Sequence, residues 1–268
     1  MVKQLINKKL TALITGASSG IGLEIAKLFA QNGFNLLLIA RSQDTLNTIA
    51  NELGNSCSVQ VNCLAQDLSV TSAPDKIFQY IDKEKLEVDV LVNNAGFGWF
   101  GEFSRMELSD MLGMIQVNIS SLTHLTRLIL PEMLKKNEGK ILNISSTAGF
   151  QPGPLMAVYY ASKAYVLSFS QALSEELKNT NITVTTLCPG PTPTNFGKRA
   201  GFKDKPILHG VLSMDSHTVA LSGYKGMMKG KTLVIPGRLN WLGTQLVRLL
   251  PRSVPGKFIK LAQQKRGN

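Results

Sequence analysis

The stretch Thr15-Gly16-Ala17-Ser18-Ser19-Gly20-Ile21-Gly22, residues 15–22, decides the fold of this 268-residue chain. It follows a short apolar run over 10–15 and precedes a helical pattern over 21–31. Glycines allow a tight turn and let a phosphate approach the backbone, while the N-terminus of the next helix offers free N–H groups. The pattern therefore predicts a strand–loop–helix unit that holds nucleotide phosphates. An ordinary glycine-rich turn is the alternative.

Strand and helix patterns alternate along the rest of the chain. Strands are expected at 10–15, 34–40, 59–64, 88–92, 140–144, 182–187 and 232–235, and helices at 21–31, 44–53, 109–136, around Tyr159 to 179, and 215–229. Repeated β-α units predict an α/β fold: a single-domain, Rossmann-type, doubly wound parallel sheet of about seven strands, flanked by helices. We expect this domain over 1–237, with a substrate lid near 195–215, and a basic amphipathic C-terminal extension over 238–268.

Composition narrows the class of protein. Hydrophobic residues make up 44% and charged residues 18%, which is typical of a folded globular chain. No apolar run reaches the roughly 18 residues of a membrane span. The three cysteines are odd in number and lack metal-ligand spacing, so we expect no metal site and a reducing, cytoplasmic compartment.

The positive charge is concentrated at the C-terminus. All 18 acidic residues precede residue 216, whereas 216–268 contain 10 of the 29 Lys and Arg residues. Short amphipathic stretches after residue 237 could lie on an anionic membrane surface, which predicts peripheral membrane contact. The alternative is a helix packed on its own domain or on a partner subunit. Nothing resembles a nucleic-acid recognition module, so no nucleic acid is expected.

Residues 143–163, NISSTAGFQPGPLMAVYYASK, contain the groups for chemistry. Tyr159 and Lys163 are four residues apart, which places both on one helical face. A nearby ammonium favours the phenolate and should lower the tyrosine pKa from about 10, so that the phenol becomes a usable acid or base. Ser145 and Ser146 end a buried strand at the edge where such sheets bind ligands. This set indicates carbonyl or alcohol chemistry. A chance Tyr-x-x-x-Lys pair is the alternative.

The end of the second strand bears on the choice of cofactor. A nicotinamide-binding fold of this kind usually has an acid there, which bonds the ribose 2′-hydroxyl of NAD. Here Ala40 is followed by Arg41 and Ser42. An arginine can clamp a 2′-phosphate, so the sequence predicts NADP(H) in preference to NAD(H). A surface arginine without this role is the alternative.

Several motifs occur in a fixed order across residues 15–194. They are Thr15-Gly16-x-x-x-Gly20-x-Gly22, Asp67, Asn93-Asn94-Ala95-Gly96, Asn118, Ser146, Tyr159-x-x-x-Lys163 and Pro189-Gly190-x-x-x-Thr194. Each motif alone is weak to moderate, but together they are highly specific. In these motifs the chain resembles the short-chain dehydrogenase/reductase family in its single-domain form. Ser146 matches the catalytic serine of that family better than Ser145, because it lies thirteen residues before Tyr159.

The resemblance implies catalytic roles for Asn118, Ser146, Tyr159 and Lys163. Tyr159 would be the general acid or base, Lys163 would lower its pKa and bond the nicotinamide ribose, Ser146 would polarise the carbonyl, and Asn118 would hold a proton-relay water. With the glycine loop and Arg41, the expected cofactor-binding residues are Gly16, Ser18, Ser19, Gly20, Ile21, Arg41, Asp67, Leu68, Asn93, Ala95, Gly96, Tyr159, Lys163, Pro189, Gly190 and Thr194. One departure is Ser19, where some NADP-preferring members carry a basic residue.

The expected function is an NADP-dependent oxidoreductase that transfers a hydride between nicotinamide and a carbonyl or alcohol group. Apolar residues at 97–100, 150–155 and Phe196 follow the site motifs, which indicates a hydrophobic small-molecule substrate, although they could equally be core packing. The alternative function is a non-catalytic NADP-binding or membrane-docked scaffold of the same fold. By resemblance, a homodimer or homotetramer is expected.

Overall fold

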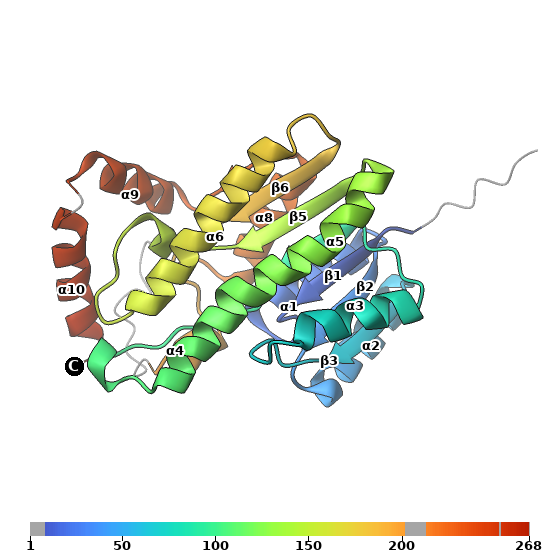
Figure 1. Ribbon diagram of the computed structural model, residues 1–268, viewed down its shortest axis with the longest axis horizontal. Helices are drawn as coiled ribbons and strands as arrows, with labels where there is room; N and C mark the ends of the chain where they lie inside the picture. The colour runs from blue at the N-terminus through green and yellow to red at the C-terminus, as the bar shows by residue number, and fades with distance from the viewer. Residues whose placement is uncertain (1–8, 202–212, 252, 268) are drawn as a thin grey trace, which may run out of the picture.

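A computed structural model describes residues 9–201, 213–251 and 253–267. Its centre is an all-parallel, seven-stranded sheet with the order β3-β2-β1-β4-β5-β6-β7 (Figure 1). The strands are β1 (Thr11–Thr15), β2 (Asn35–Ala40), β3 (Val61–Ala65), β4 (Val90–Asn93), β5 (Gly139–Ile144), β6 (Ile182–Leu187) and β7 (Leu233–Val234). The chain runs outward from β1 to β3 and returns to β4 beside β1. This reversal opens a crevice at the carboxyl ends of the strands, where such sheets bind ligands.

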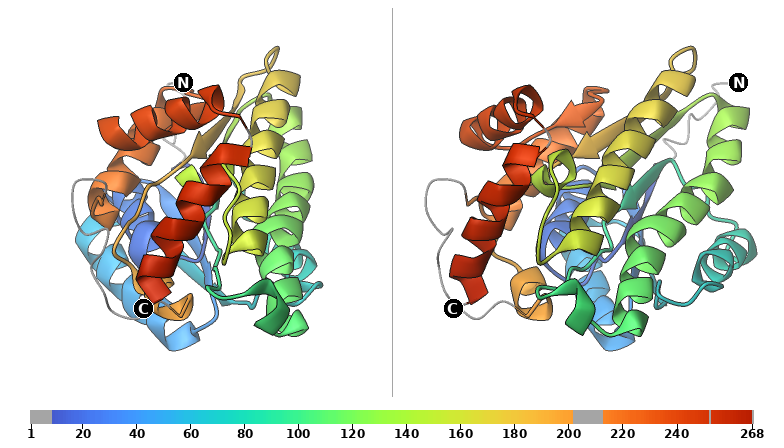
Figure 2. Two further views of the ribbon diagram at one scale, coloured as in Figure 1. Left: turned by 90° about the vertical axis from the view of Figure 1, so that its left-hand side faces the viewer. Right: turned by 60° about the vertical axis from the view of Figure 1, so that its left-hand side comes forward.

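Helices cover both faces of the sheet. They are α1 (Gly20–Gln31), α2 (Gln43–Cys57), α3 (Ala73–Lys83), α4 (Leu108–Ile115), α5 (Leu122–Lys136), α6 (Ala157–Glu176), α7 (Asn195–Arg199), α8 (Ser216–Met228), α9 (Arg238–Leu249) and α10 (Ser253–Gly267), with 3-10 turns at Phe103–Arg105 and Thr147–Phe150. A π-helical turn, Gln116–Ser121, joins α4 to α5. The views in Figure 1 and Figure 2 place α9 and α10 at one end of the molecule, beyond β7 and the start of α6.

Alternation along the strands builds two apolar cores, one on each sheet face. Ile14 and Leu38 point toward α1, α2 and α8, whereas their neighbours Leu13 and Leu37 point toward α3, α5 and α6. All four side chains are fully buried. Successive residues of a strand face opposite sides, so a strand covered on both sides must be apolar throughout. This explains the continuous apolar runs in the sequence.

The structure confirms the predicted fold class and all seven predicted strands, with ends shifted by up to two residues. Helix α3 is not among the predicted elements. The single helix predicted over 109–136 is interrupted by the π-helical turn. Of the predicted lid over 195–215, residues 195–199 form α7 and 202–212 lie outside the described residues.

Three further observations concern the described residues. None of their helices is both long and apolar enough to cross a bilayer. Cys57, Cys63 and Cys188 are free thiols. The described part of the chain holds no cluster of three or more His, Cys, Asp or Glu side chains that could bind a metal ion.

Candidate active site

The glycine loop between β1 and α1 is closely packed against the turn that follows β4. Gly16 and Gly20 have φ of +65° and +57°, in the left-handed region that glycine adopts without strain. A Cβ on Gly16 would lie 2.8 Å from Asn94 Nδ2, and one on Gly20 would lie 3.0 Å from Thr194 Cγ2. The backbone here therefore admits only glycine, and it forms a cradle beside the N-terminus of α1 that fits a pyrophosphate. Ser18, Ser19 and Ile21 lie in this cradle, partly exposed.

Asn94 holds the loop in place, a role that the sequence analysis did not assign. Its Nδ2 donates to the carbonyl oxygens of Thr15 at 2.9 Å and Gly16 at 3.1 Å. Its own N–H, and that of Ala95, donate to Thr15 Oγ1. These bonds join β1 to β4 across the crevice. The sequence feature that could have indicated this role is the Asn-Asn-Ala-Gly motif, in which Asn94 is the second asparagine.

Asn93 turns away from the crevice. Its side chain is buried and donates to Asn143 Oδ1 at 2.9 Å and Thr126 Oγ1 at 3.0 Å. Asn143 donates in turn to Ser170 on α6. The Asn93 side chain thus ties β4, β5, α5 and α6 together and steadies the sheet. Any contact with a cofactor would have to come from its backbone.

Lys163 is anchored to the end of β5. It is buried, and its Nζ donates to the Ile144 carbonyl at 2.9 Å. Ser145 donates its hydroxyl to the Lys163 backbone carbonyl at 2.7 Å. Nζ also lies 5.8 Å from the centroid of the Tyr159 ring. The two residues predicted to share a helical face therefore lie side by side over the strand end.

Of the two serines, Ser146 is the one that reaches Tyr159. A hydrogen bond joins the Ser146 and Tyr159 side chains. The Ser146 hydroxyl also accepts from the Ala148 N–H and lies 3.3 Å from the Pro189 carbonyl. Ser145 instead faces inward, toward the backbone of α6. The catalytic role expected for Ser146 stays a prediction.

Asn118 lies within the π-helical turn between α4 and α5. Such turns insert an extra residue into a helix and are frequent at functional sites. Asn118 Nδ2 donates to the Phe97 carbonyl and to Ser162 Oγ, and its Oδ1 accepts from the Phe97 N–H. A Cβ on Gly96 would lie 3.1 Å from Asn118 Oδ1 and 3.3 Å from Lys163 Nζ. Asn118, Gly96 and Lys163 therefore meet at one point, behind Tyr159.

Burial shifts the pKa values of both central groups. Tyr159 as a whole is partly exposed, but its phenol is surrounded by protein. Burial raises the pKa of Tyr159 above its ordinary value of 10, and the Ser146 hydrogen bond only partly offsets this. Burial lowers the pKa of Lys163 from 10.5 to about 8, because a buried ammonium loses its hydration. The expected lowering of the tyrosine pKa by the lysine is therefore wrong for this structure, in which burial is the larger effect.

Charged groups surround the far end of the crevice. Partial burial alone would raise the pKa of Asp67. The hydrogen bonds from Ser69 and the positive charges of Arg41 and Arg199 lower that pKa by a larger amount, so the net shift is downward. The Arg199 guanidinium lies 4.5 Å from the centroid of the Phe97 ring. Arg199, on α7, had no signal in the sequence analysis, because its position depends on how the chain turns after Thr194. Leu68 is buried and uses its carbonyl to accept from Ser121.

The loop after β6 borders the crevice on the side opposite the glycine loop. Pro189 accepts from the Thr147 N–H at 2.9 Å. A Cβ on Gly190 would collide with the buried side chain of Asn240, which belongs to α9. The Thr194 hydroxyl accepts from the Phe196 N–H. Helix α9 therefore supports the loop that contains Pro189, Gly190 and Thr194, three of the residues expected to bind the cofactor.

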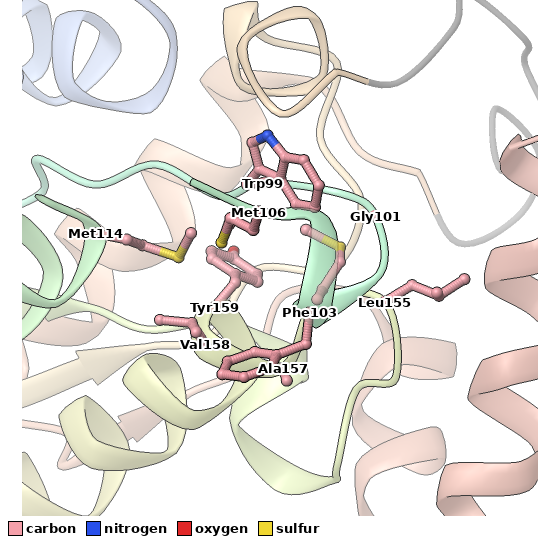
Figure 3. A pocket seen from close by; sticks show the side chains of 10 residues that line it. Trp99, Gly101, Phe103, Met106, Met114, Leu155, Ala157, Val158 and Tyr159 are labelled. Atoms are coloured by element: carbon pink, nitrogen blue, oxygen red, sulfur yellow. The ribbon is translucent and has the colours of Figure 1, made fainter. Parts of the chain in front are cut away.

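An apolar pocket opens beside Tyr159. Its lining includes Trp99, Phe103, Met106, Met114, Leu155 and Met156. Figure 3 shows Trp99, Met106 and Met114 near the tyrosine ring. The ring of Phe196 lies 5.1 Å from the Tyr159 ring. Of the apolar residues expected to form a substrate pocket, Trp99, Leu155 and Phe196 lie here, whereas Phe97 packs behind, against Asn118 and Arg199.

A sequence profile described as short chain dehydrogenase matches residues 10–204. The chain belongs to the short-chain dehydrogenase family. It is therefore an oxidoreductase that acts on CH–OH or C=O groups with a nicotinamide cofactor, NAD or NADP, as family members do. The fold and the motif order agree with this assignment.

Three relatives illustrate the similarity. The very-long-chain 3-oxoacyl-CoA reductase of Mus musculus is 33% identical over 260 residues, which cover 93% of this chain and 82% of that protein. A short-chain dehydrogenase from Sphingobium yanoikuyae in complex with NADPH is 31% identical, with a TM-score of 0.80 over 90% of this chain and 94% of its own. The bulky-bulky ketone specific alcohol dehydrogenase from Comamonas testosteroni is 28% identical, with a TM-score of 0.76 over 90% and 92%.

The lowered pKa of Lys163 predicts a pH dependence of stability. Below pH 8 the lysine is protonated in both folded and unfolded chains. Between about pH 8 and 10.5 the unfolded chain holds the extra proton, so the free energy of unfolding rises with pH. Relative to Lys163→Met, the wild-type protein should gain up to about 3 kcal/mol across this range, at about 1.4 kcal/mol per pKa unit.

Urea unfolding at several pH values measures this difference. Lys76→Met, on the exposed side of α3, is the control and should follow the wild-type profile. Parallel profiles for the wild type and Lys163→Met would contradict the assigned pKa.

Proposed function

We propose that this chain is an NADP-dependent carbonyl reductase or alcohol dehydrogenase for an apolar small molecule, with Tyr159 as the general acid or base. One observation carries the proposal. The Tyr159 phenol, hydrogen-bonded to Ser146 and beside buried Lys163, faces an apolar pocket next to the glycine cradle. Hydride transfer to a ketone needs a proton donor, a hydroxyl that can polarise the carbonyl, and a cradle for the nucleotide.

Each residue of the site would have its own role in the reaction. Bound NADPH would supply the hydride. Ser146 would donate a hydrogen bond to the substrate oxygen and stabilise the negative charge that develops there. Tyr159, whose raised pKa keeps it protonated at neutral pH, would give its proton to that oxygen. Lys163 and Asn118, which meet beside Gly96, would then return a proton to the tyrosine.

Three features support NADP over NAD. No acid ends β2, where Arg41 and Ser42 follow Ala40. Arg199 lies close enough to interact with Arg41 and Asp67, which adds positive charge at the same end of the crevice. The related Sphingobium protein was solved in complex with NADPH. An arginine fork suits a 2′-phosphate, whereas NAD would leave it without a partner.

The apolar pocket supports a hydrophobic carbonyl substrate. Aromatic and Met side chains line it, and Tyr159 is the group in it able to exchange a proton. Relatives named for very-long-chain 3-oxoacyl-CoA and for bulky ketones point to the same class of substrate.

The outer faces of α4 and α6 support an oligomer. Leu108 and Leu112 on α4 and Tyr165 on α6 are exposed. The resemblance implies a homodimer or homotetramer, and exposed apolar side chains such as these favour association. We therefore propose a homodimer or homotetramer formed through this face.

Tyr159→Phe tests the proposed chemistry. Loss of the phenol proton should lower turnover of apolar ketones by roughly 10²–10⁴-fold, while the dissociation constant for NADPH stays nearly unchanged. Loss of NADPH absorbance measures turnover, and nucleotide fluorescence measures binding.

Tyr160→Phe is the matched control and should keep its activity, because the Tyr160 hydroxyl accepts a hydrogen bond from Gln263 on α10. Full activity in Tyr159→Phe would overturn the role of Tyr159. Tight NADPH binding without turnover in the wild type, across a broad panel of ketones, would favour the non-catalytic scaffold.

Arg41→Ala tests the choice of nucleotide. Loss of a charge-assisted bond should weaken NADPH binding by about 10- to 100-fold and leave NADH binding unchanged. Isothermal titration with both nucleotides measures the effect. Arg127→Ala, on the exposed side of α5, should change neither constant. An equal loss for both nucleotides would contradict a 2′-phosphate contact.

Light scattering tests assembly. A mass of two or four subunits is expected for the wild type, and Leu108→Glu with Leu112→Glu should shift it toward the monomer, because buried carboxylates oppose association. A monomer at all concentrations in the wild type would refute the proposed interface.

A further inference from the structure

Helix α9 carries its polar side inward and its apolar side outward. The residues that face the protein are Asn240 and Thr244, both buried. The opposite side presents Leu239, Leu242, Leu246 and Leu249, which repeat at helical spacing and are exposed, Leu249 by 82%. A surface helix of a globular protein normally shows the reverse arrangement. The inward position of Asn240 has a local reason, because it packs on Gly190.

Trp241 adds an aromatic ring to the outer surface. It is 53% exposed, although tryptophan is among the side chains that bury the most apolar area. Its indole has an apolar body and one N–H donor, a combination that favours the boundary between water and lipid. The outer side of α9 is therefore an apolar surface with an amphipathic anchor.

Helix α10 continues this surface. Its inner side packs against the start of α6 and the segment before it. Pro255 is buried, Gly256 lies beside Pro152, and Gln263 donates to the Tyr160 hydroxyl at 3.2 Å. The outer side bears Lys257, Lys260 and Leu261, with Phe258 beside them at 66% exposure. In the left view of Figure 2 both helices lie at the front of the molecule, so their outer sides share one end of it.

The charge of this end has one sign. From residue 216 onward the sequence contains ten Lys and Arg residues and no Asp or Glu. Exposed Arg238 and Arg248 lie on α9, and exposed Lys257 and Lys260 on α10. Basic groups beside exposed leucine, tryptophan and phenylalanine form a surface that is both cationic and apolar.

We propose that α9 and α10 form a docking surface for an anionic membrane. The leucines, Trp241 and Phe258 would enter the boundary between headgroups and acyl chains, while the lysines and arginines would contact lipid phosphates. A second copy of the chain is a poorer occupant, because the same positive surface on both partners would repel. Nucleic acid would match the charge but not the exposed leucines. The proposed contact is peripheral, because the outer sides of the two helices make it.

Vesicle sedimentation with the full chain tests this proposal. Vesicles of phosphatidylcholine with about 30% phosphatidylglycerol should bind the protein in low salt, because at this anionic fraction each lysine near the surface contributes appreciably to binding. Vesicles of pure phosphatidylcholine should bind it much less. Binding should weaken as salt is added. Trp241 emission should shift to shorter wavelengths, and Trp241→Phe should remove the shift although Trp99 remains.

Two double variants separate the apolar and basic contributions. Lys257→Gln with Lys260→Gln should lower the partition coefficient by roughly 30-fold, which corresponds to about 1 kcal/mol for each charge. Leu242→Ser with Leu246→Ser should lower it by at least about tenfold through lost apolar burial. These side chains point away from the protein, so ketone reduction in free solution should persist in both variants and show that they are folded.

Matched controls come from helices on other sides. Lys76→Gln with Lys83→Gln on α3 removes two exposed lysines, and Leu134→Ser on α5 removes a leucine as exposed as Leu242, 45% each. Both controls should bind vesicles as the wild type does. Equal binding by every variant, or no binding to anionic vesicles, would overturn the proposal. If only the lysine variant lost vesicle binding, and if added nucleic acid prevented the wild-type protein from binding vesicles, the surface would be assigned to a polyanion instead.

Discussion

The contact between α6 and the end of β5 holds the site together. Ser145 donates to the Lys163 backbone carbonyl, and Lys163 Nζ donates to the Ile144 carbonyl, so helix and strand are joined by two bonds in opposite directions. Gly149, in the 3-10 turn after β5, lets that turn approach α6, because a Cβ there would lie 2.7 Å from the Lys163 carbonyl oxygen. The packing of α6 on the end of β5 therefore brings Tyr159 close to Ser146, which lies two residues after the strand at the start of the 3-10 turn.

Burial acts on Tyr159 and Lys163 in the same sense, since it disfavours the charged form of each. The phenol keeps its proton and the ammonium gives up its proton more readily than in water. At neutral pH the phenol is therefore uncharged, whereas Lys163, with a pKa of about 8, still holds its proton for most of the time. The pair thus combines a neutral acid with an ammonium that releases its proton more easily than a lysine in water does.

The sequence predicted the parts of the site that depend on local pattern. The glycine loop, the strand ends and the Tyr159–Lys163 spacing need only short segments, and the strands were visible because burial on both faces leaves continuous apolar runs. Asn94, Asn240 and Arg199 were missed because their partners are distant in sequence: Asn240, for example, meets Gly190 fifty residues earlier. Helix α3 was missed although its apolar side faces the core through Ile77 and Ile81.

The π-helical turn at Gln116–Ser121 has a consequence for the helix around it. Each residue of an α-helix advances the chain by about 100°, so an inserted residue shifts the phase of everything after it. Met111 and Met114 of α4 can thus face inward near the pocket while Leu125 and Ile129 of α5 face the sheet. If residues 108–136 were treated as one continuous α-helix, their apolar residues would not fall on a single face. Its two halves are separate amphipathic units with different angular registers, and deleting one residue of the turn would misalign the second half against the core.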